Sequence, residues 1–107
     1  MVQQIATKEE FDAFLTEAGD KLVCVDFFAT WCPPCRGIAP YFAKLADENP
    51  DVVFAKVDCE ENEVVAEEQK IDAYPQFVFF KGGEKLDESK GSDKTRLVDK
   101  LQELIAA

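Results

Sequence analysis

The sequence predicts an α/β protein built on a mixed β-sheet with helices on both faces. Two observations carry this prediction: apolar runs of strand length alternate with amphipathic helical patterns, and one pair of strands is joined directly by a glycine turn. The expected order is β-α-β-α-β-α-β-β-α. Strand–helix–strand units favour parallel neighbours, whereas a hairpin is antiparallel. With 107 residues, the chain is expected to be a single domain spanning residues 1–107.

The first expected elements are a short strand over residues 2–5 and an amphipathic helix. Thr7 to Glu10 fits a capping box, in which the Thr7 hydroxyl accepts from the third helical N–H and Glu10 reaches back. Gly19 ends this helix. Its apolar side chains follow the spacing of one helical face, at Phe11, Phe14, Leu15 and Ala18.

The middle of the chain alternates buried strands with helices. Residues 22–28 are apolar on both alternating faces, as expected of a central strand, and residues 52–57 form a second buried strand. Residues 38–46 form a helix with Pro40 in its interior, where we expect a kink, and Pro50 closes the segment.

The last third of the chain contains a short helix, a hairpin and a terminal helix. Asn62 is the expected cap of a helix that runs through Lys70. Residues 76–80 and 85–88 are the strands of a hairpin that turns at Gly82–Gly83. The last helix begins near Lys94, and its core stripe consists of Leu97, Val98, Leu101, Leu104 and Ile105.

Two cysteines, Cys32 and Cys35, stand where a buried strand ends and a helix begins. A helix start concentrates unpaired N–H groups and the positive end of the dipole, which favours an anion. The pKa of the Cys32 thiol is therefore expected to fall about one unit below the free-thiol value of about 8.5. Because thiolates attack disulfides, we interpret Cys32 as a nucleophile and Cys35, one turn deeper, as the resolving thiol.

A metal site and a structural disulfide are the alternatives for this pair. A tetrahedral zinc site needs two further ligands, but the sequence has no histidine and the other cysteines, Cys24 and Cys59, are isolated. A disulfide that closes so short a loop stabilises a protein by only about 2 kcal/mol. Redox chemistry without a bound metal is therefore the favoured interpretation.

The composition restricts the partners and the cellular location. A net charge of −10 argues against nucleic acid and anionic membrane surfaces as partners. The simplest explanation of this charge is that it keeps the protein soluble. No basic, apolar leader opens the chain, and no apolar run is long enough to span a membrane. Four cysteines without a secretory signal indicate a reducing compartment, and we expect the cytoplasm.

The chain resembles the thioredoxin family over its full length. The resemblance lies in residues 25–27, 29–32, 34–35, 39–40, 57–58, 74–75 and 79–80 and in Gly91, and residues 18–23 look most like the cytosolic eukaryotic branch. It implies a thioredoxin fold with a five-stranded mixed sheet and four helices. It also implies a protein-disulfide reductase that has no bound cofactor, acts on disulfide-containing proteins and receives electrons from NADPH through thioredoxin reductase. We also expect a monomer.

The resemblance also assigns roles to single residues. It implies that Cys32 is the nucleophile and Cys35 the resolving thiol. Pro75 matches the cis-proline of the family, whose preceding residue offers its backbone to an extended substrate. The substrate-binding surface implied in this way comprises Trp31, Pro34, Tyr74, Pro75 and Gly91.

Asp26 is the next candidate, because it lies within the apolar run of the central strand. If it points inward, burial raises its pKa, and it is a proton acceptor and donor for Cys35. Lys56 is equally unusual in its own strand and is a candidate for tuning the Asp26 pKa. The alternatives are a half-exposed strand aspartate and a surface lysine that only buries its stem.

Several residues depart from the family pattern. Pro33 stands where the family usually has glycine; it lacks an N–H and is expected to disfavour helix at its own position. Gly37 replaces a bulkier residue, and Tyr74 places a large ring where a smaller residue is common. Cys24 and Cys59 are expected to be buried or half-buried, with Cys59 exposed enough to oxidise as the alternative.

We therefore predict a thiol–disulfide oxidoreductase that reduces protein disulfides through a reversible Cys32–Cys35 dithiol. The alternative from another class is an interaction or chaperone module that binds extended peptides without turnover.

Overall fold

The computed structural model describes residues 2–107 and contains five strands and four helices within that range. The strands are β1 (Val2–Gln4), β2 (Val23–Phe28), β3 (Val53–Asp58), β4 (Gln76–Lys81) and β5 (Glu84–Lys90). The helices are α1 (Lys8–Ala18), α2 (Pro33–Glu48), α3 (Glu63–Glu68) and α4 (Lys94–Ala106). The sheet order is β1-β3-β2-β4-β5. Strands β1, β3 and β2 are parallel, whereas β4 is antiparallel to β2 and β5, so the predicted mixed sheet is confirmed.

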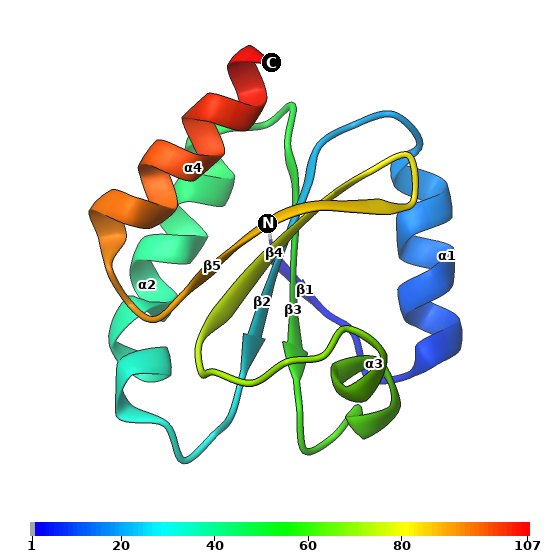
Figure 1. Ribbon diagram of the computed structural model, residues 1–107, viewed down its shortest axis with the longest axis vertical. Helices are drawn as coiled ribbons and strands as arrows, with labels where there is room; N and C mark the ends of the chain where they lie inside the picture. The colour runs from blue at the N-terminus through cyan, green and yellow to red at the C-terminus, as the bar shows by residue number, and fades with distance from the viewer. Residues whose placement is uncertain (1) are drawn as a thin grey trace.

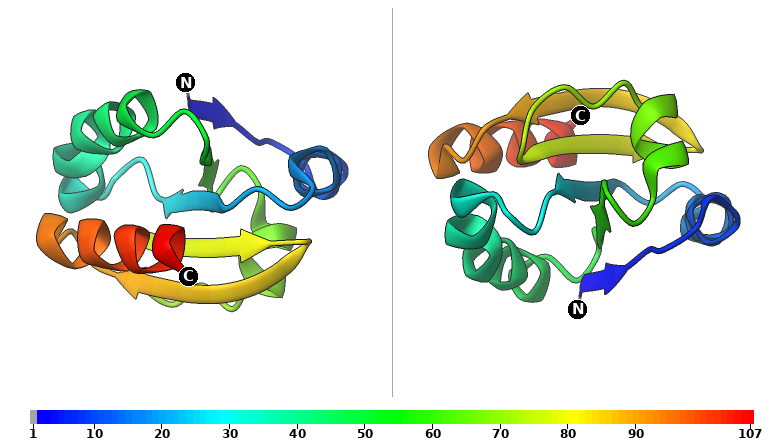
Figure 2. Two further views of the ribbon diagram at one scale, coloured as in Figure 1. Left: turned by 90° about the horizontal axis from the view of Figure 1, so that it is seen from above. Right: turned by 90° about the horizontal axis from the view of Figure 1, so that it is seen from below.

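The helices form a layer on each face of the sheet. Figures 1 and 2 show α2 and α4 on one face and α1 and α3 on the other. A core cluster lies on each side: one contains Phe11 of α1 and Val65 of α3, and the other contains Ile38 of α2 and Leu97 of α4. The helices therefore bury the central strands from both sides, as the apolar runs predicted.

Strand β2 distributes its side chains between these two clusters by strict alternation. Val23, Val25 and Phe27 pack on the α1/α3 side, whereas Cys24 packs on the α2/α4 side. Because alternate strand residues share a face, Asp26 lies on the same face as Cys24, beneath α2. Because of this alternation, Asp26, the only charged residue of β2, lies on the face covered by α2, the helix that contains Cys35.

Helix α1 begins and ends where its sequence predicted. The Thr7 Oγ1 accepts from the Glu10 N–H at 3.1 Å, which is the threonine half of the expected capping box. Gly19 ends the helix with a positive φ of 59°, a conformation that glycine adopts without a steric penalty. Helix α4 has a cap that the sequence analysis missed: the Asp93 Oδ1 accepts from the Arg96 N–H at 3.1 Å.

The predictions for α3 were partly wrong. Asn62 lies at the N-cap position, but its side chain does not cap the helix; its Nδ2 donates to the Ile5 carbonyl at 3.5 Å. The helix ends at Glu68 rather than at Lys70. Lys70 has a φ of 55°, so the left-handed backbone at this residue is incompatible with a continuing helix.

Helix α2 is longer than the predicted 38–46 and begins at Pro33. The expectation that Pro33 disfavours helix at its own position was therefore wrong. Proline is tolerated in the first turn because no intrahelical hydrogen bond uses its nitrogen there, and its φ suits a helix. The helix continues through Pro40 to Glu48, and a kink at Pro40 stays a prediction.

Candidate active site

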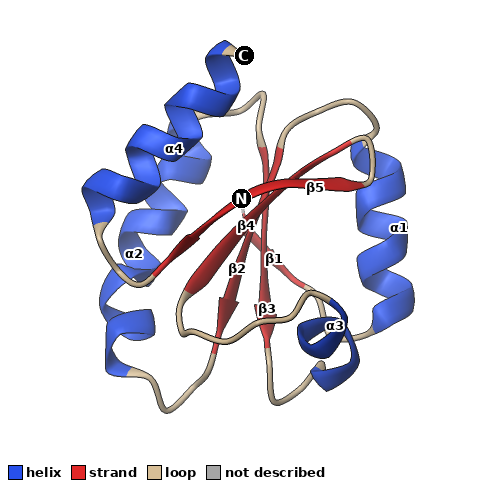
Figure 3. Cartoon of the chain, viewed as in Figure 1, coloured by secondary structure: helices blue, strands red, loops and turns tan. Residues whose placement is uncertain are grey.

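Three loops meet at one end of the sheet, where β2 and β3 end and β4 begins. Figure 3 shows the loops after β2 and β3 and the loop before β4 at this end of the molecule. The Cys59 N–H donates to the Phe28 carbonyl at 2.9 Å, which joins the loop after β3 to the end of β2. The Arg36 Nη1 donates to the Thr30 carbonyl at 2.8 Å and fastens the first loop to α2.

Cys32 and Cys35 lie in this corner and are joined as a disulfide, with their Cα atoms 5.3 Å apart. Cys32 is the N-cap of α2, and Cys35 lies in the first turn of the helix. Each residue is only 3% exposed, so exposure does not distinguish a nucleophile from a resolving thiol. Their surroundings differ instead, because Cys32 faces the loop before β4 and Cys35 lines a cavity.

Only one backbone N–H of the first helical turn reaches the Cys32 sulfur. The Cys35 N–H donates to the Cys32 Sγ at 3.2 Å, and the Cys32 N–H is already bonded to the Ala29 carbonyl at 3.2 Å. The two positions between them are Pro33 and Pro34, which have no N–H. The helix start therefore offers the sulfur a single donor, the Cys35 N–H, consistent with the missing N–H that the sequence shows at Pro33.

Tyr74 lies beside the disulfide. The Tyr74 carbonyl oxygen is 3.6 Å from the Cys32 Sγ. Trp31 is 61% exposed and Tyr74 is 38% exposed, and their rings meet edge to face with centroids 5.6 Å apart. Two exposed aromatic side chains thus flank the sulfur and the backbone carbonyl next to it.

Pro75 and Gly91 complete this surface from β4 and β5. The Tyr74–Pro75 peptide bond is cis. The Gly91 N–H donates to the Pro75 carbonyl at 2.8 Å, and Gly91 has a φ of 90° that favours glycine. Pro34 is exposed on the first turn of α2. The structure therefore brings Trp31, Tyr74, Pro75 and Gly91 to one corner with the disulfide, with Pro34 on the adjoining helix start.

Asp26 is buried directly behind this corner, with an exposed fraction of 4%. Its Oδ1 has no hydrogen-bond partner among residues 2–107. Burial raises the pKa of Asp26 from 3.8 to about 7, and the positive charge of Lys56 opposes this rise. A pKa near 7 is the value that suits a general base working near neutral pH.

A cavity of about 250 Å³ joins Asp26 to the second cysteine. Its lining includes Asp26, Lys56, Cys35 and Arg36. The Lys56 Nζ also lies 5.9 Å from the centroid of the Phe28 ring, on the wall of the same cavity. The structure thus brings together the three residues that the sequence linked: the carboxyl group of Asp26, the amine of Lys56 and the Cys35 sulfur.

The other two cysteines, Cys24 and Cys59, are buried and form no disulfide. Burial raises the pKa of Cys24 well above its usual value. Burial and then the charge of Asp58 raise the pKa of Cys59 to about 12. The alternative in which Cys59 is exposed enough to oxidise is therefore wrong, because the residue lies in the core cluster beneath α1 and α3.

Gln76 is a residue of this corner that sequence reasoning did not single out. Its side chain is buried at the start of β4, and its amide is bonded to the loop before it and to β5. The available signal was a long polar side chain at the head of an apolar strand.

Among the described residues, no group of acidic, cysteine or histidine side chains could hold a metal, and no helix is long and apolar enough to cross a membrane.

Comparisons with known proteins agree on one family. The family model described as Thioredoxin matches residues 2–103. A thioredoxin from Geodia cydonium is 48% identical over 103 residues, which cover 95% of this chain and 97% of that protein. The human thioredoxin is 44% identical over 105 residues, which cover 98% of this chain and all (100%) of that protein.

Solved structures agree in fold as well as in sequence. The crystal structure of Fasciola hepatica thioredoxin superimposes with a TM-score of 0.93 at 40% identity, covering 95% of this chain and 98% of that one. A poplar thioredoxin h superimposes with a TM-score of 0.95 at 34% identity, covering 99% of this chain and 97% of that one.

Proposed function

This chain belongs to the thioredoxin family and is a thiol–disulfide oxidoreductase that reduces protein disulfides, and we propose that Cys32 is its nucleophile and Cys35 its resolving thiol. The observation that carries the assignment of roles is the different surroundings of the two sulfurs. Cys32 lies at the helix start beside the Tyr74 carbonyl, where an incoming protein can dock, whereas Cys35 lines the cavity with Asp26.

The proposed reaction transfers two electrons to the substrate in two exchanges. The Cys32 thiolate attacks one sulfur of the substrate disulfide, forms a mixed disulfide and releases the other substrate sulfur as a thiolate. The Cys35 thiolate then attacks the Cys32 sulfur, which forms the Cys32–Cys35 disulfide and releases the second substrate thiolate. Both released thiolates take up protons, so the substrate is reduced and the protein is oxidised.

The second exchange requires Cys35 to lose its proton, and we assign this proton to Asp26. The shared cavity supports this role, because its volume of about 250 Å³ leaves room for bridging water between the carboxyl group and the thiol. The Asp26 pKa of about 7 also supports it, because a base titrating near the working pH accepts and returns a proton readily. Lys56 tunes this base by lowering the Asp26 pKa below the value that burial alone would give.

The substrate docks, in this proposal, on the surface around the Tyr74 carbonyl. An extended substrate segment pairs with the backbone of Tyr74 next to Pro75, and Gly91 forms the far edge. The exposed rings of Trp31 and Tyr74 and the exposed ring of Pro34 supply apolar contacts beside the sulfur. This arrangement supports recognition of a backbone rather than of one particular side chain.

We further propose that the oxidised chain is a cytoplasmic monomer recycled by thioredoxin reductase with electrons from NADPH. The family membership supports this electron source. A net charge of −10 disfavours nucleic acid and anionic membranes as partners, and the family membership supports disulfide-containing proteins and the reductase instead.

Insulin reduction tests the catalytic roles. The reduced wild-type protein should reduce the insulin disulfides, and Cys32→Ser should abolish this activity. A Cys32→Ser protein that reduces insulin at the wild-type rate would remove Cys32 as the nucleophile. A peptide-binding module would give a different result. Its wild type would not turn over the substrate, and a variant without both active-site thiols would still bind a disulfide-containing partner.

The reduction potential of the Cys32–Cys35 pair tests the direction of the reaction. Equilibration against a glutathione buffer should give a value near the ~ −270 mV that is typical of thioredoxins. A value near −180 mV or higher, which is roughly that of protein disulfide isomerase and of stronger oxidants, would contradict a reductase.

A further inference from the structure

The loop of residues 71–75, called here the docking loop, carries the Tyr74 carbonyl yet has no regular secondary structure. Its position is therefore fixed by contacts with its neighbours. The Ile71 N–H donates to the Ala66 carbonyl at 3.0 Å, and the Pro75 carbonyl accepts from Gly91 at 2.8 Å. Between these two ends, the loop is held by a side chain from the first residue of β4.

That side chain is Gln76, which is 1% exposed. Its Oε1 accepts from the Asp72 N–H at 3.1 Å, and its Nε2 donates to the Glu88 Oε1 at 3.2 Å. The orientation of the amide is determined by these partners, because a backbone N–H needs an acceptor and a carboxylate needs a donor. Gln76 therefore connects the docking loop to β5 through the interior.

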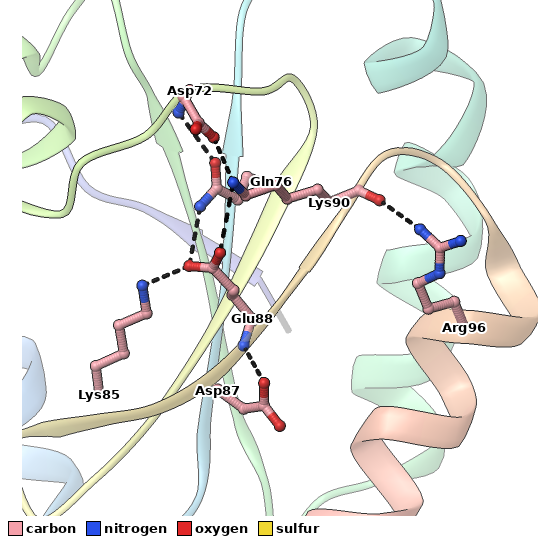
Figure 4. Close-up of polar contacts among 7 residues, drawn as sticks. All are labelled: Asp72, Gln76, Lys85, Asp87, Glu88, Lys90 and Arg96. Atoms are coloured by element: carbon pink, nitrogen blue, oxygen red, sulfur yellow. Dashed lines mark hydrogen bonds and ion pairs between the residues drawn. The ribbon is translucent and has the colours of Figure 1, made fainter.

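The connection continues outside the core and returns to the loop. The Glu88 Oε2 lies 3.6 Å from the Lys90 Nζ, and this amine lies 2.8 Å from the Asp72 Oδ1. Gln76, Glu88, Lys90 and Asp72 thus form a closed ring of contacts, which Figure 4 shows. The ring holds Asp72 twice, by its backbone N–H and by its carboxylate.

Both strands beneath the ring are fixed independently of it. Gln76 is paired with Phe27 of β2 and with Lys90 of β5 in the sheet. Strand β5 is also tied to α4, because the Lys90 carbonyl accepts from the Arg96 Nη1 at 3.2 Å (Figure 4). Asp72 is therefore the one member of the ring that lies outside the sheet, and its contacts with Gln76 and Lys90 hold the docking loop against the sheet.

We propose that Gln76 is a positioning residue for substrate docking: the contact ring that it closes with Asp72, Glu88 and Lys90 holds the docking loop so that the Tyr74 carbonyl lies beside the Cys32 sulfur. A substrate segment then meets a carbonyl already in place, and binding does not have to order the loop. This inference rests on the proposed docking of substrates at Tyr74. It concerns the binding of protein substrates and leaves the chemistry of the sulfurs unchanged.

Gln76→Leu tests the inference, because leucine fills a similar volume and forms neither hydrogen bond. The KM for insulin should rise between about twofold and tenfold, the factor expected for the loss of the one hydrogen bond that reaches the docking loop. The reaction with cystamine, a small disulfide that does not need the loop, should keep its rate within about twofold, and amide exchange at Asp72 should accelerate. Asn62→Leu is the matched control, because Asn62 is also a buried amide but donates to Ile5.

Lys90→Met tests the same ring at an exposed position, where a failure to fold is not expected. It should raise the insulin KM in the same direction as Gln76→Leu. An unchanged KM in both variants would overturn the inference, as would an equal loss of rate toward insulin and cystamine. A wild-type protein that reduces cystamine but not insulin would instead refute the proposed function, so the two failures are distinguishable.

Discussion

Asp26 and Lys56 lie opposite each other on the neighbouring parallel strands β2 and β3, and both line the cavity beside Cys35. Burial is the larger influence on the Asp26 carboxyl group and raises its pKa to about 7, while Lys56 acts in the opposite direction. A buried residue that titrates near neutral pH makes stability depend on pH, and under the proposed mechanism it also makes the exchange reaction depend on pH. The pair therefore offers direct tests of the account.

The stability of the protein should fall as the pH rises from 5 to 8. Asp26 has a raised pKa in the folded state, so its contribution is complete below the unfolded pKa of 3.8 and is lost as the pH rises through about 7. The free energy of unfolding should fall by about 2–3 kcal/mol over this interval. Asp72, Asp87 and Glu88 do not contribute to this fall, because their pKa values are lowered.

Asp26→Asn should remove most of this pH dependence. Urea unfolding of the oxidised proteins at several pH values measures it, with the wild type as the reference. Parallel slopes for the two proteins between pH 5 and pH 8 would show that Asp26 is not the group responsible.

Lys56→Met should raise the Asp26 pKa above its wild-type value of about 7, because the opposing positive charge is removed while the burial remains. NMR titration of the Asp26 carboxyl carbon measures the change. The pH at which Cys35 resolves a mixed disulfide at half its maximal rate should move upward with it. Lys44→Met is the control, because Lys44 is exposed and pairs with Glu48 on α2; a similar change in both variants would contradict a specific role for Lys56.

Gly37→Ala should stabilise the protein by up to about 1 kcal/mol. Gly37 lies inside α2, has an ordinary helical backbone, and a Cβ placed on it would meet no atom within 4 Å. The substitution therefore removes the entropic penalty of glycine without creating a clash. Thermal unfolding measures the effect, and a lower midpoint in the variant would contradict the open surroundings of Gly37.

The sequence predicted the features of this fold that depend on local patterns. The alternation of β2 placed Asp26 inward, and the position of Cys32 between a strand and a helical pattern predicted its location at a helix start. These predictions succeed because strand alternation and helix starts follow directly from short-range residue order.

Contacts between distant segments were the part that could not be predicted. The expectation that Cys59 is buried or half-buried was confirmed, but its place in the core cluster with Phe11 and Val65 depends on packing against α1 and α3. The role of Gln76 depends on the register that places β4 beside β5 and on the path of the docking loop. Asn62 looked like a helix cap, but its side chain is used by Ile5, which lies 57 residues away.

The most direct test of the proposed chemistry is to capture the intermediate. Cys35→Ser, mixed with a disulfide-containing protein, should accumulate a covalent adduct, because its resolving thiol is absent. Peptide mapping by mass spectrometry should locate the adduct at Cys32, and Cys24 and Cys59 should stay unmodified in their buried positions. An adduct located at another cysteine, or complete turnover without Cys35, would contradict the assignment of the two sulfurs.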